Sequence, residues 1–460
     1  MSKKAIFKPE HQNCPQVDDK PRYWYLNPLQ QPAGVWSGSE QYVDFEIDQN
    51  IGVAESIKLR LNVKYNGADV GTGTGPNGAN GWYPALPPTP YWISRVEVYV
   101  GSDGPVETVY ADSVWHETFS FLRDQEQKNV ADIYNLNLND VGGAKDLTAK
   151  NWYNPEEYTT ANSGLPAGDQ PISVISTTQF PSQTTSGYYY ISLDATMLSA
   201  MRPYVRGFQS KFRIRVYFPS SIVSQYGLKV QGVAGTSAPV FYTAVQPSVS
   251  LVQMIVEEQQ TDPASLAKLE MAHRAGIVDY TCAIRERFQD SPSILTGLTQ
   301  NTSFLRAFRN KSAGLVCYLV HSNEANQSLT RRLAFQSWQL LDSRGNKITE
   351  ILDNDVLTSY IFPSQINSSF PNSAPPDMRT VILLPFAKKF QPVYKDGCSY
   401  GNFQLTSLEQ LILTPDNGTA NTPLPNGEMS SVGSNTIITV VSYSYAHVTC
   451  VAGKHSIRYE

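Results

Sequence analysis

The sequence predicts an all-β protein built from two tandem β-sandwich domains of Greek-key or jelly-roll type. Three observations support this prediction. The chain has 460 residues, whereas a single core stops growing at roughly 250–300 residues. Apolar residues recur with a period of two along most of the chain, and helix signals are few. Hydrophobic residues make up 41% of the chain and aromatic residues 11%, which is enough apolar material for two packed cores.

The period-two segments define the expected strands. Alternate side chains of a strand point to opposite faces, so regular alternation of apolar and polar residues indicates a sheet with one buried side. In Ile57–Tyr65, for example, apolar residues alternate with lysine, arginine and asparagine. We expect amphipathic strands, with the alternating apolar residues facing inward, at Val43–Ile47, Ile57–Tyr65, Val96–Val100, Phe212–Phe218 and Ile437–Tyr445.

One helix is expected near the middle of the chain. Asp262 suits the N-cap, Pro263 the first helical position, and Gly276 the position past the end. We therefore predict a linker helix over 261–276, between a first domain at 36–260 and a second at 277–460. Long polar loops rich in Gly and Pro separate the strands, and loops of this length usually carry binding or assembly roles. They are 66–90, 135–185, 226–247, 364–377 and 415–434.

An internal repeat supports a duplicated domain. Trp92–Val114 resembles Ala334–Val356, since each has a strand, a tight turn with glycine, a short strand and a short segment that contains aspartate and ends in valine. Another strand precedes each copy, Ile57–Tyr65 in the first and Leu315–Val320 in the second. The alternative interpretation is a chance likeness between two hairpins, because glycine turns commonly link strands.

Composition excludes several classes of protein. Charged residues are only 17% and the formal net charge is −5, which argues against a protein that coats nucleic acid. The five scattered cysteines lack a Cys-x-x-Cys pair, and no apolar stretch follows Met1–Pro9, so we expect neither a disulfide framework nor a secretory signal. The longest apolar runs are far short of the ~18 residues of a membrane span. We expect a reducing compartment and no membrane crossing.

No catalytic constellation emerges, and we predict no catalytic residues, no cofactor-binding residues and no metal site. Gly73–Gly78 has GxGxxG spacing, but the following residues cannot open a helix. His116 and Glu117 begin like a zincin motif, yet the second histidine is missing. Asp112, Ser113 and His116 lack a nucleophile elbow, so a solvated turn is the better interpretation. Cys317 lies in an apolar strand and is expected to be a small buried hydrophobe.

The order of these segments resembles the double jelly-roll major capsid proteins of tectiviruses, polinton-like viruses, virophages and adenovirus hexons. The hairpin Pro90–Val100 with Asp112–His116 is similar to the first roll of that family. The other matching segments are Gln209–Phe218 as a late strand, Ser248–Glu258 as the strand leading out, Arg309–Val320 as the opening of the second roll, and Ile437–Tyr459 as the closing segment. The resemblance covers most of 41–459 in pattern and order.

This resemblance implies two tandem eight-stranded jelly-roll domains with long inserted loops and few short helices. It further implies a capsid protein of an icosahedral double-stranded DNA virus, found in the virion shell and assembled inside the host cell. The partners implied are its own copies in a homotrimer, neighbouring capsomers, penton and minor capsid proteins, and an internal membrane, with no sequence-specific nucleic acid. Two similar domains around a three-fold axis give six nearly equivalent faces. We expect residues 1–35, with Lys3, Lys4 and Lys8, to be a flexible arm that orders on assembly.

Two other functions remain open at this point. The first is a viral spike or lectin-like protein that binds carbohydrate or a receptor through exposed Tyr and Trp in its loops. The second is a β-sandwich glycoside hydrolase, because two carboxylates distant in sequence can meet in space. Trimers that tile into shells distinguish the capsid protein from a glycan-binding lectin, and activity on a panel of glycans would identify the hydrolase.

Overall fold

The computed structural model describes most of the expected strands and the expected linker helix. The described ranges are 21–64, 82–84, 92–113, 186–220, 228–230, 240–241, 248–290, 301–321, 335–356, 381–386, 402–415 and 436–459, apart from a few positions within them. The GxGxxG segment, His116 and Glu117 lie outside these ranges, as does most of each long loop.

The first set of eight strands forms two four-stranded antiparallel sheets. Sheet I has the order β1-β11-β3-β7, and sheet II has the order β2-β8-β5-β6. Numbered 1 to 8 along the chain, these strands have the orders 1-8-3-6 and 2-7-4-5. The strands are β1 (Arg22–Leu26), β2 (Gln41–Glu46), β3 (Val53–Lys64), β5 (Arg95–Val100), β6 (Glu107–Tyr110), β7 (Ser186–Ser192), β8 (Phe212–Phe218) and β11 (Ser248–Gln259).

The second set of eight strands repeats this order. Sheet III is β12-β19-β14-β17 and sheet IV is β13-β18-β15-β16, which are again 1-8-3-6 and 2-7-4-5. Such paired four-stranded sheets with long crossovers are jelly rolls. The strands are β12 (Val278–Asp290), β13 (Asn301–Phe304), β14 (Gly314–His321), β15 (Phe335–Leu341), β16 (Leu352–Asp353), β17 (Val381–Pro385), β18 (Gln410–Pro415) and β19 (Thr436–Val451). The prediction of two tandem jelly rolls is confirmed.

The remaining elements are additions to the two rolls. A small sheet, β10-β9-β4, joins segments inserted into the first roll, and β20 (Lys454–Tyr459) pairs with the end of β19. The other elements are β4 (Trp82–Pro84), β9 (Leu228–Val230), β10 (Val240–Phe241), α6 (Met197–Met201), η5 (Val205–Gly207) and α7 (Pro263–Arg274). Among the described residues, no helix is both long and apolar enough to cross a membrane.

Helix α7 confirms the predicted helix between the two sets of strands. The Asp262 carboxylate accepts hydrogen bonds from the backbone N–H groups of Ala264 and Ser265, and Pro263 occupies the first turn, where no backbone donor is needed. Gly276 follows the helix with φ 66°, a conformation that favours glycine. The helix begins and ends where the capping residues predicted.

The internal repeat is confirmed at the level of topology. Its two copies contain β5 with β6 and β15 with β16, which are the fourth and fifth strands of their rolls. The strands expected upstream of each copy, β3 and β14, are both third strands. Each hairpin turn contains a glycine with positive φ, Gly101 (76°) directly after β5 and Gly345 (80°) four residues after β15, so the turns differ in detail.

Three sequence-based expectations need correction. Strand β1 lies within the predicted flexible arm and pairs with β11, because Trp24 and Leu26 pack on the core of the first roll. Arg309–Val320 does not open the second roll, since β14 is its third strand and β12 its first. In β19 the alternating set Ile437–Tyr445 was expected to face its own core, but Ile438 and Val440 occupy that core instead.

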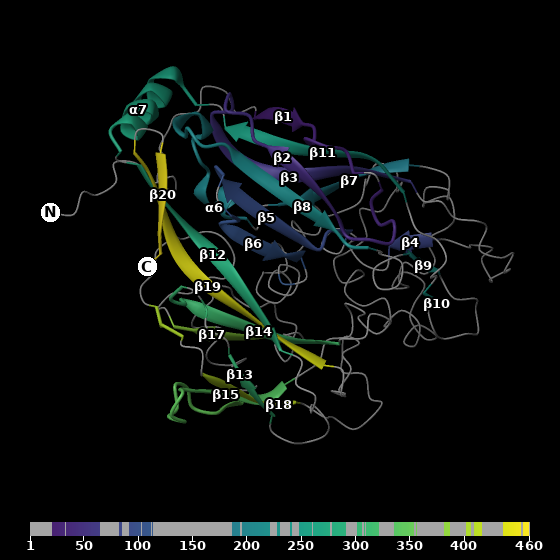
Figure 1. Cartoon of the computed structure of the whole chain (residues 1–460), viewed down its shortest axis with the longest axis vertical. Helices are drawn as coiled ribbons and strands as arrows, with labels where there is room; N and C mark the ends of the chain where they lie inside the picture. The colour runs from purple at the N-terminus through teal and green to yellow at the C-terminus, as the bar shows by residue number, and fades with distance from the viewer. Residues whose placement is uncertain are drawn as a thin grey trace, which may run out of the picture.

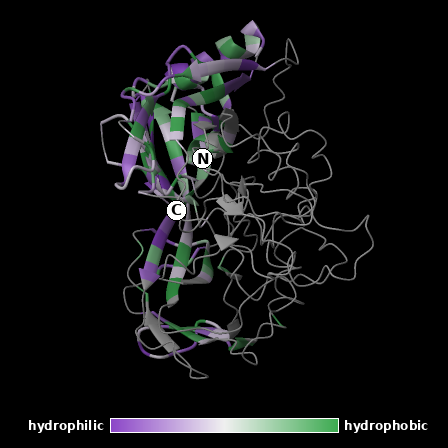
Figure 2. Cartoon of the chain, turned by 90° about the vertical axis from the view of Figure 1, so that its right-hand side faces the viewer, coloured by the Kyte–Doolittle hydropathy of each residue, from purple (hydrophilic) through white to green (hydrophobic). Residues whose placement is uncertain are grey.

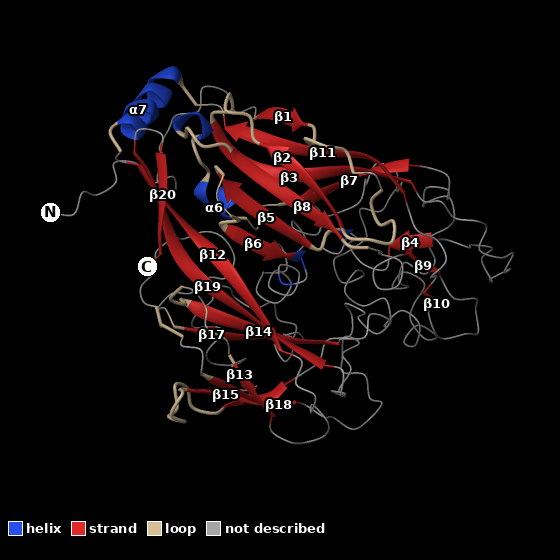
Figure 3. Ribbon diagram, viewed as in Figure 1, coloured by secondary structure: helices blue, strands red, loops and turns tan. Residues whose placement is uncertain are grey.

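The four sheets are arranged along the long axis of the molecule. Figure 1 shows sheets I and II together in the upper part, sheet III below them and sheet IV at the bottom, and Figure 3 shows how little of the described chain is helical. Green and purple bands along the strands in Figure 2 mark apolar and polar residues that follow one another in the sequence. The core of the first roll also includes Tyr280, Ile284, Ala446 and Val448 from the second, so one apolar cluster spans both rolls.

Candidate functional site

The described part of the chain offers little for catalysis. It contains no group of three or more His, Cys, Asp or Glu side chains able to hold a metal ion. Cys317 is fully buried in β14, and burial raises the pKa of its thiol to about 12. A thiol with that pKa is not a nucleophile near neutral pH. The interpretation of Cys317 as a small buried hydrophobe is therefore confirmed.

Of the hydrolytic set considered from the sequence, only Ser113 is described. Asp112 and His116 lie outside the described residues. The Ser113 hydroxyl is 2.7 Å from the Tyr318 hydroxyl of β14 and is buried there. Ser113 therefore contributes to a contact between the two rolls.

The best-defined site among the described residues is this contact, which we call the joint. It is formed by β6, Ala111, Ser113 and α6 of the first roll with β12, β14 and β19 of the second. Side chains on the outer face of sheet III, which point away from the second roll's own core, are nevertheless buried. They are Val316, Tyr318, Val441, Tyr443 and Tyr445. Sheet III is thus covered on both faces.

A buried ion pair lies in the joint. Arg285 of β12 and Glu107 of β6 approach to 3.7 Å, and their side chains are 5% and 0% exposed. Glu107 also accepts a hydrogen bond of 2.6 Å from the backbone N–H of Met197 in α6, and Arg285 lies over the Tyr443 ring. A buried charge is strongly destabilising without its partner. The pair therefore favours one arrangement of the rolls.

An aromatic cluster joins the linker helix to both rolls. His273 of α7 packs against Tyr204, Phe208 and Tyr280, with its Nε2 atom 2.8 Å from the Tyr280 hydroxyl. The Tyr280 hydroxyl accepts a hydrogen bond from the backbone N–H of Tyr204. Burial lowers the pKa of His273 to about 4, because the charged imidazolium loses its hydration. His273 is therefore neutral at physiological pH.

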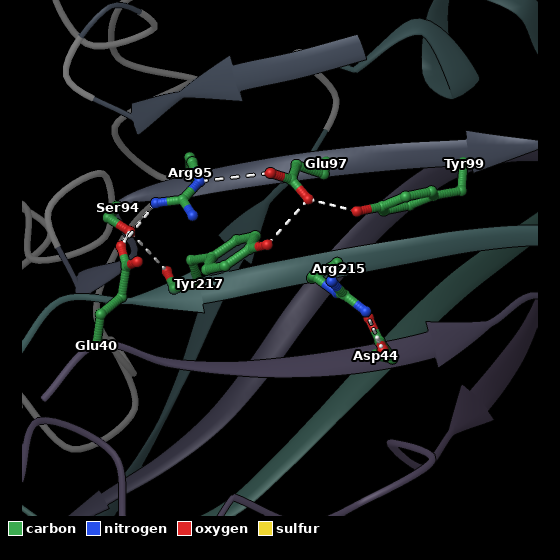
Figure 4. Close-up of polar contacts among 8 residues, drawn as sticks. All are labelled: Glu40, Asp44, Ser94, Arg95, Glu97, Tyr99, Arg215 and Tyr217. Atoms are coloured by element: carbon green, nitrogen blue, oxygen red, sulfur yellow. Dashed lines mark hydrogen bonds and ion pairs between the residues drawn. The ribbon is translucent and has the colours of Figure 1, made fainter. Parts of the chain in front are cut away.

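The outer face of sheet II carries a network of tyrosine, arginine and carboxylate groups (Figure 4). The Glu97 carboxylate accepts hydrogen bonds from the Tyr99 and Tyr217 hydroxyls at 2.6 and 3.0 Å. Burial, followed by the hydrogen bond to Glu97, raises the pKa of Tyr99 to about 12. Arg215 makes a bidentate contact with Asp44 at 2.7 and 2.9 Å. Such paired geometry holds both charged groups in place.

Arginine and tyrosine stack alternately across this face. The Arg95 guanidinium lies 3.6 Å from the centre of the Tyr217 ring, and the Arg215 guanidinium lies 4.2 Å from that of Tyr42. At the β6 end, Arg287 of the second roll lies 4.3 Å from the centre of the Tyr110 ring. These cation–π contacts continue the network across the joint. Its opposite end, at Tyr42, is exposed.

The sequence interpretation missed these groups for a physical reason. Alternating arginines in Phe212–Phe218 indicate an outer strand face, but period two does not show that the guanidinium groups stack on tyrosines of neighbouring strands. Arg285 and Arg287 alternate with Ile284, Glu286 and Phe288 in the same way. This alternation was the signal in the sequence that β12 has a face carrying arginines.

Solved structures with the same fold are found among viral capsids, whereas no protein-family model and no curated protein matches the sequence. A chain of the PBCV-1 virus capsid aligns with a TM-score of 0.61 at 12% identity, covering 96% of this chain and 97% of that one. A chain of the Sputnik virophage aligns with a TM-score of 0.56 at 9% identity, covering 99% and 92%. The Faustovirus major capsid protein aligns with a TM-score of 0.53 at 8% identity, covering 94% and 90%.

The chain has the double jelly-roll fold of these capsid proteins. The alignments extend over nearly the full length of each chain, so they include both rolls and the connection between them. At identities of 8–12% the likeness concerns the fold, and residue roles have to come from this chain's own contacts.

We expect a double-mutant cycle to show that Glu107 and Arg285 act together. Glu107→Gln keeps an acceptor for the Met197 N–H but leaves the Arg285 charge without its carboxylate, and Arg285→Met leaves Glu107 unpaired. Each should destabilise the protein, and the double variant should recover about 0.5–3 kcal/mol relative to their sum. Denaturant unfolding measures this coupling.

The exposed pair Lys347–Glu350 provides the matched control. Its coupling should be near zero, because solvent screens exposed charges. Strict additivity for Glu107 and Arg285 would show that the joint does not depend on their pairing.

We also expect the protein to lose stability as the pH falls from about 6.5 to about 4. The pKa of His273 is about 4 in the folded chain and about 6.5 in an unfolded one. The unfolded state therefore binds an extra proton in this window, which costs on the order of 3 kcal/mol by pH 4. The free energy of unfolding, measured across this range, should fall less steeply in His273→Gln.

His455→Gln is the control for this measurement, since His455 lies on β20 outside the aromatic cluster and contacts Ser210. It should leave the wild-type pH dependence unchanged. If wild type and His273→Gln have the same slope, His273 is not the group that links the cluster to protonation.

Proposed function

We propose that this chain is the major capsid protein of an icosahedral double-stranded DNA virus. In this proposal it forms homotrimeric, pseudo-hexagonal capsomers that tile the shell of the virion, and it is assembled inside the host cell. We propose no catalytic role. The observation that carries the proposal is the exact repetition of strand order in two rolls that share an apolar core.

The joint supports this function in physical terms. A tile must keep its shape while it makes weak contacts with several neighbours. Because the rolls share buried side chains and a buried ion pair, we infer that they move as one unit. Three copies around an axis then present six similar rolls, which suits a pseudo-hexagonal outline.

The proposed partners are further copies of the chain, neighbouring capsomers, penton and minor capsid proteins, and a membrane beneath the shell. The protein names attached to the structures of similar fold support the first two: one is a virus capsid and another is a major capsid protein. We propose that residues before β1 act as an assembly segment, because Lys3, Lys4 and Lys8 give this terminal stretch a positive charge.

Purified protein should behave as a trimer. Light scattering coupled to size exclusion should give three times the chain mass, and negative-stain images should show particles with a hexagonal outline or arrays of them. A monomer that binds glycans on an array would contradict the proposal and favour the lectin-like alternative.

Deleting residues 1–20 should leave the trimer intact and reduce shell formation, because the deletion spares β1 and every described core residue. Particle yield, counted in electron micrographs, measures the effect. Replacing Lys3, Lys4 and Lys8 by serine tests whether charge is the cause. An unchanged yield from the deletion would overturn the proposed role of this segment.

A further inference from the structure

Strand β20 leaves one of its edges open. It pairs along its full length with residues 446–451 of β19, and no described strand pairs with its other edge. Figure 1 shows β20 on the left of the molecule, below α7. The open edge of a strand presents a row of N–H and C=O groups that can pair with a further strand. We call this side of β20 the open edge.

The two faces of β20 differ in chemistry. Its basic side chains, Lys454 and Arg458, lie on one face together with Ser456, and all three are exposed. The alternate residues lie on the other face, where Ile457 packs at the margin of the apolar core that the rolls share. A strand added at the open edge therefore meets cations on one face and an apolar side chain on the other.

The surroundings of β20 are poor in acidic groups. Residues 429–459 contain no aspartate or glutamate, although acidic residues outnumber basic ones by 41 to 36 in the whole chain. Neither Lys454 nor Arg458 forms an ion pair with a described residue. The carboxylate of Asp279, on the same face two strands away, is already 3.3 Å from His447. The cations of β20 are thus available to a partner.

We propose that the open edge of β20 binds an extended segment of another protein in which acidic and apolar residues alternate. The segment adds to the sheet as a strand, with acidic side chains beside Lys454 and Arg458 and apolar side chains beside Ile457. This inference rests on the proposed function, which it deepens by assigning a surface and a chemistry to a capsid partner other than a further copy of the chain.

Charge decides between the occupants that an open strand edge can take. Opposite charges on neighbouring strands attract, and like charges repel. A second copy of β20 brings its own Lys454 and Arg458 to the edge, whereas an acidic segment brings the opposite sign. The two cations are four residues apart, or about 13 Å along the strand, which matches acidic residues four positions apart in the partner. Main-chain hydrogen bonds then supply affinity, and the alternating side chains supply specificity.

Binding of a designed peptide to the full-length protein tests the proposal. The probe is a fluorescently labelled peptide of alternating glutamate and valine, and the control peptide has lysine in place of each glutamate. Arg458→Glu reverses one charge beside the open edge. Lys347→Glu is the matched control, because Lys347 is an exposed cation between β15 and β16 and the change of charge is the same. Thermal unfolding verifies that both variants are folded.

We expect fluorescence anisotropy to show equal affinity of wild type and Lys347→Glu for the acidic peptide, and about tenfold weaker binding by Arg458→Glu. The lysine peptide should not bind the wild type. Hydrogen exchange at the amides of residues 454–459 should slow when the acidic peptide is added, because the new strand takes up the N–H groups of the open edge. Equal affinities of the two variants, or unchanged exchange in β20, would overturn the proposal.

Hydrogen exchange of the protein alone tests whether another copy occupies the edge. If all the amides of β20 exchange slowly in the trimer without peptide, a copy of the chain covers the edge and the proposal is wrong. A monomer that binds the acidic peptide would support the open edge and contradict the proposed function. A trimer that does not bind the peptide would have the opposite meaning.

Discussion

The structure depends on one constraint, which is that sheet III has two apolar faces. Its inner face packs on sheet IV through Leu315, Cys317 and Val440, as in any β-sandwich. Its outer face presents Val316, Tyr318 and Tyr443, which are also buried. A sheet of this kind is not stable with its outer face in water, because exposing those side chains would lose the free energy gained by burying their apolar surface. The first roll supplies the missing cover.

The placement of the two rolls relative to each other follows from this constraint. The apolar contact brings rolls together, but apolar surfaces are not directional and tolerate sliding. The ion pair between Glu107 and Arg285 and the hydrogen bond between Ser113 and Tyr318 are directional, so they select one register. The outer face of sheet II is different, because arginines, tyrosines and carboxylates on it pair with one another (Figure 4).

The sequence predicted the strands and the helix better than it predicted the contacts between side chains of different elements. Period two located β3, β5 and β8, the capping residues located α7, and the repeat located the fourth and fifth strands of both rolls, because each is a local signal. The period-two pattern misassigned β19, in which Ser442 and Ser444 alternate with Val441 and Tyr443. Both faces of this strand are buried, each against a different part of the structure. The joint was not predicted, because the pairing of Glu107 with Arg285 joins residues far apart in the chain. Period two shows that a face is apolar or polar, but not what covers it.

A three-dimensional reconstruction of the purified oligomer by cryo-electron microscopy tests the central claim most directly, which is that the first roll covers the outer face of sheet III and holds the two rolls of one chain together. The account predicts a three-fold particle with six rolls around the axis, in which the outer face of sheet III in each copy is buried against the first roll of the same chain. A particle in which this face is open to solvent, or in which the two rolls of one chain are separated, would contradict it.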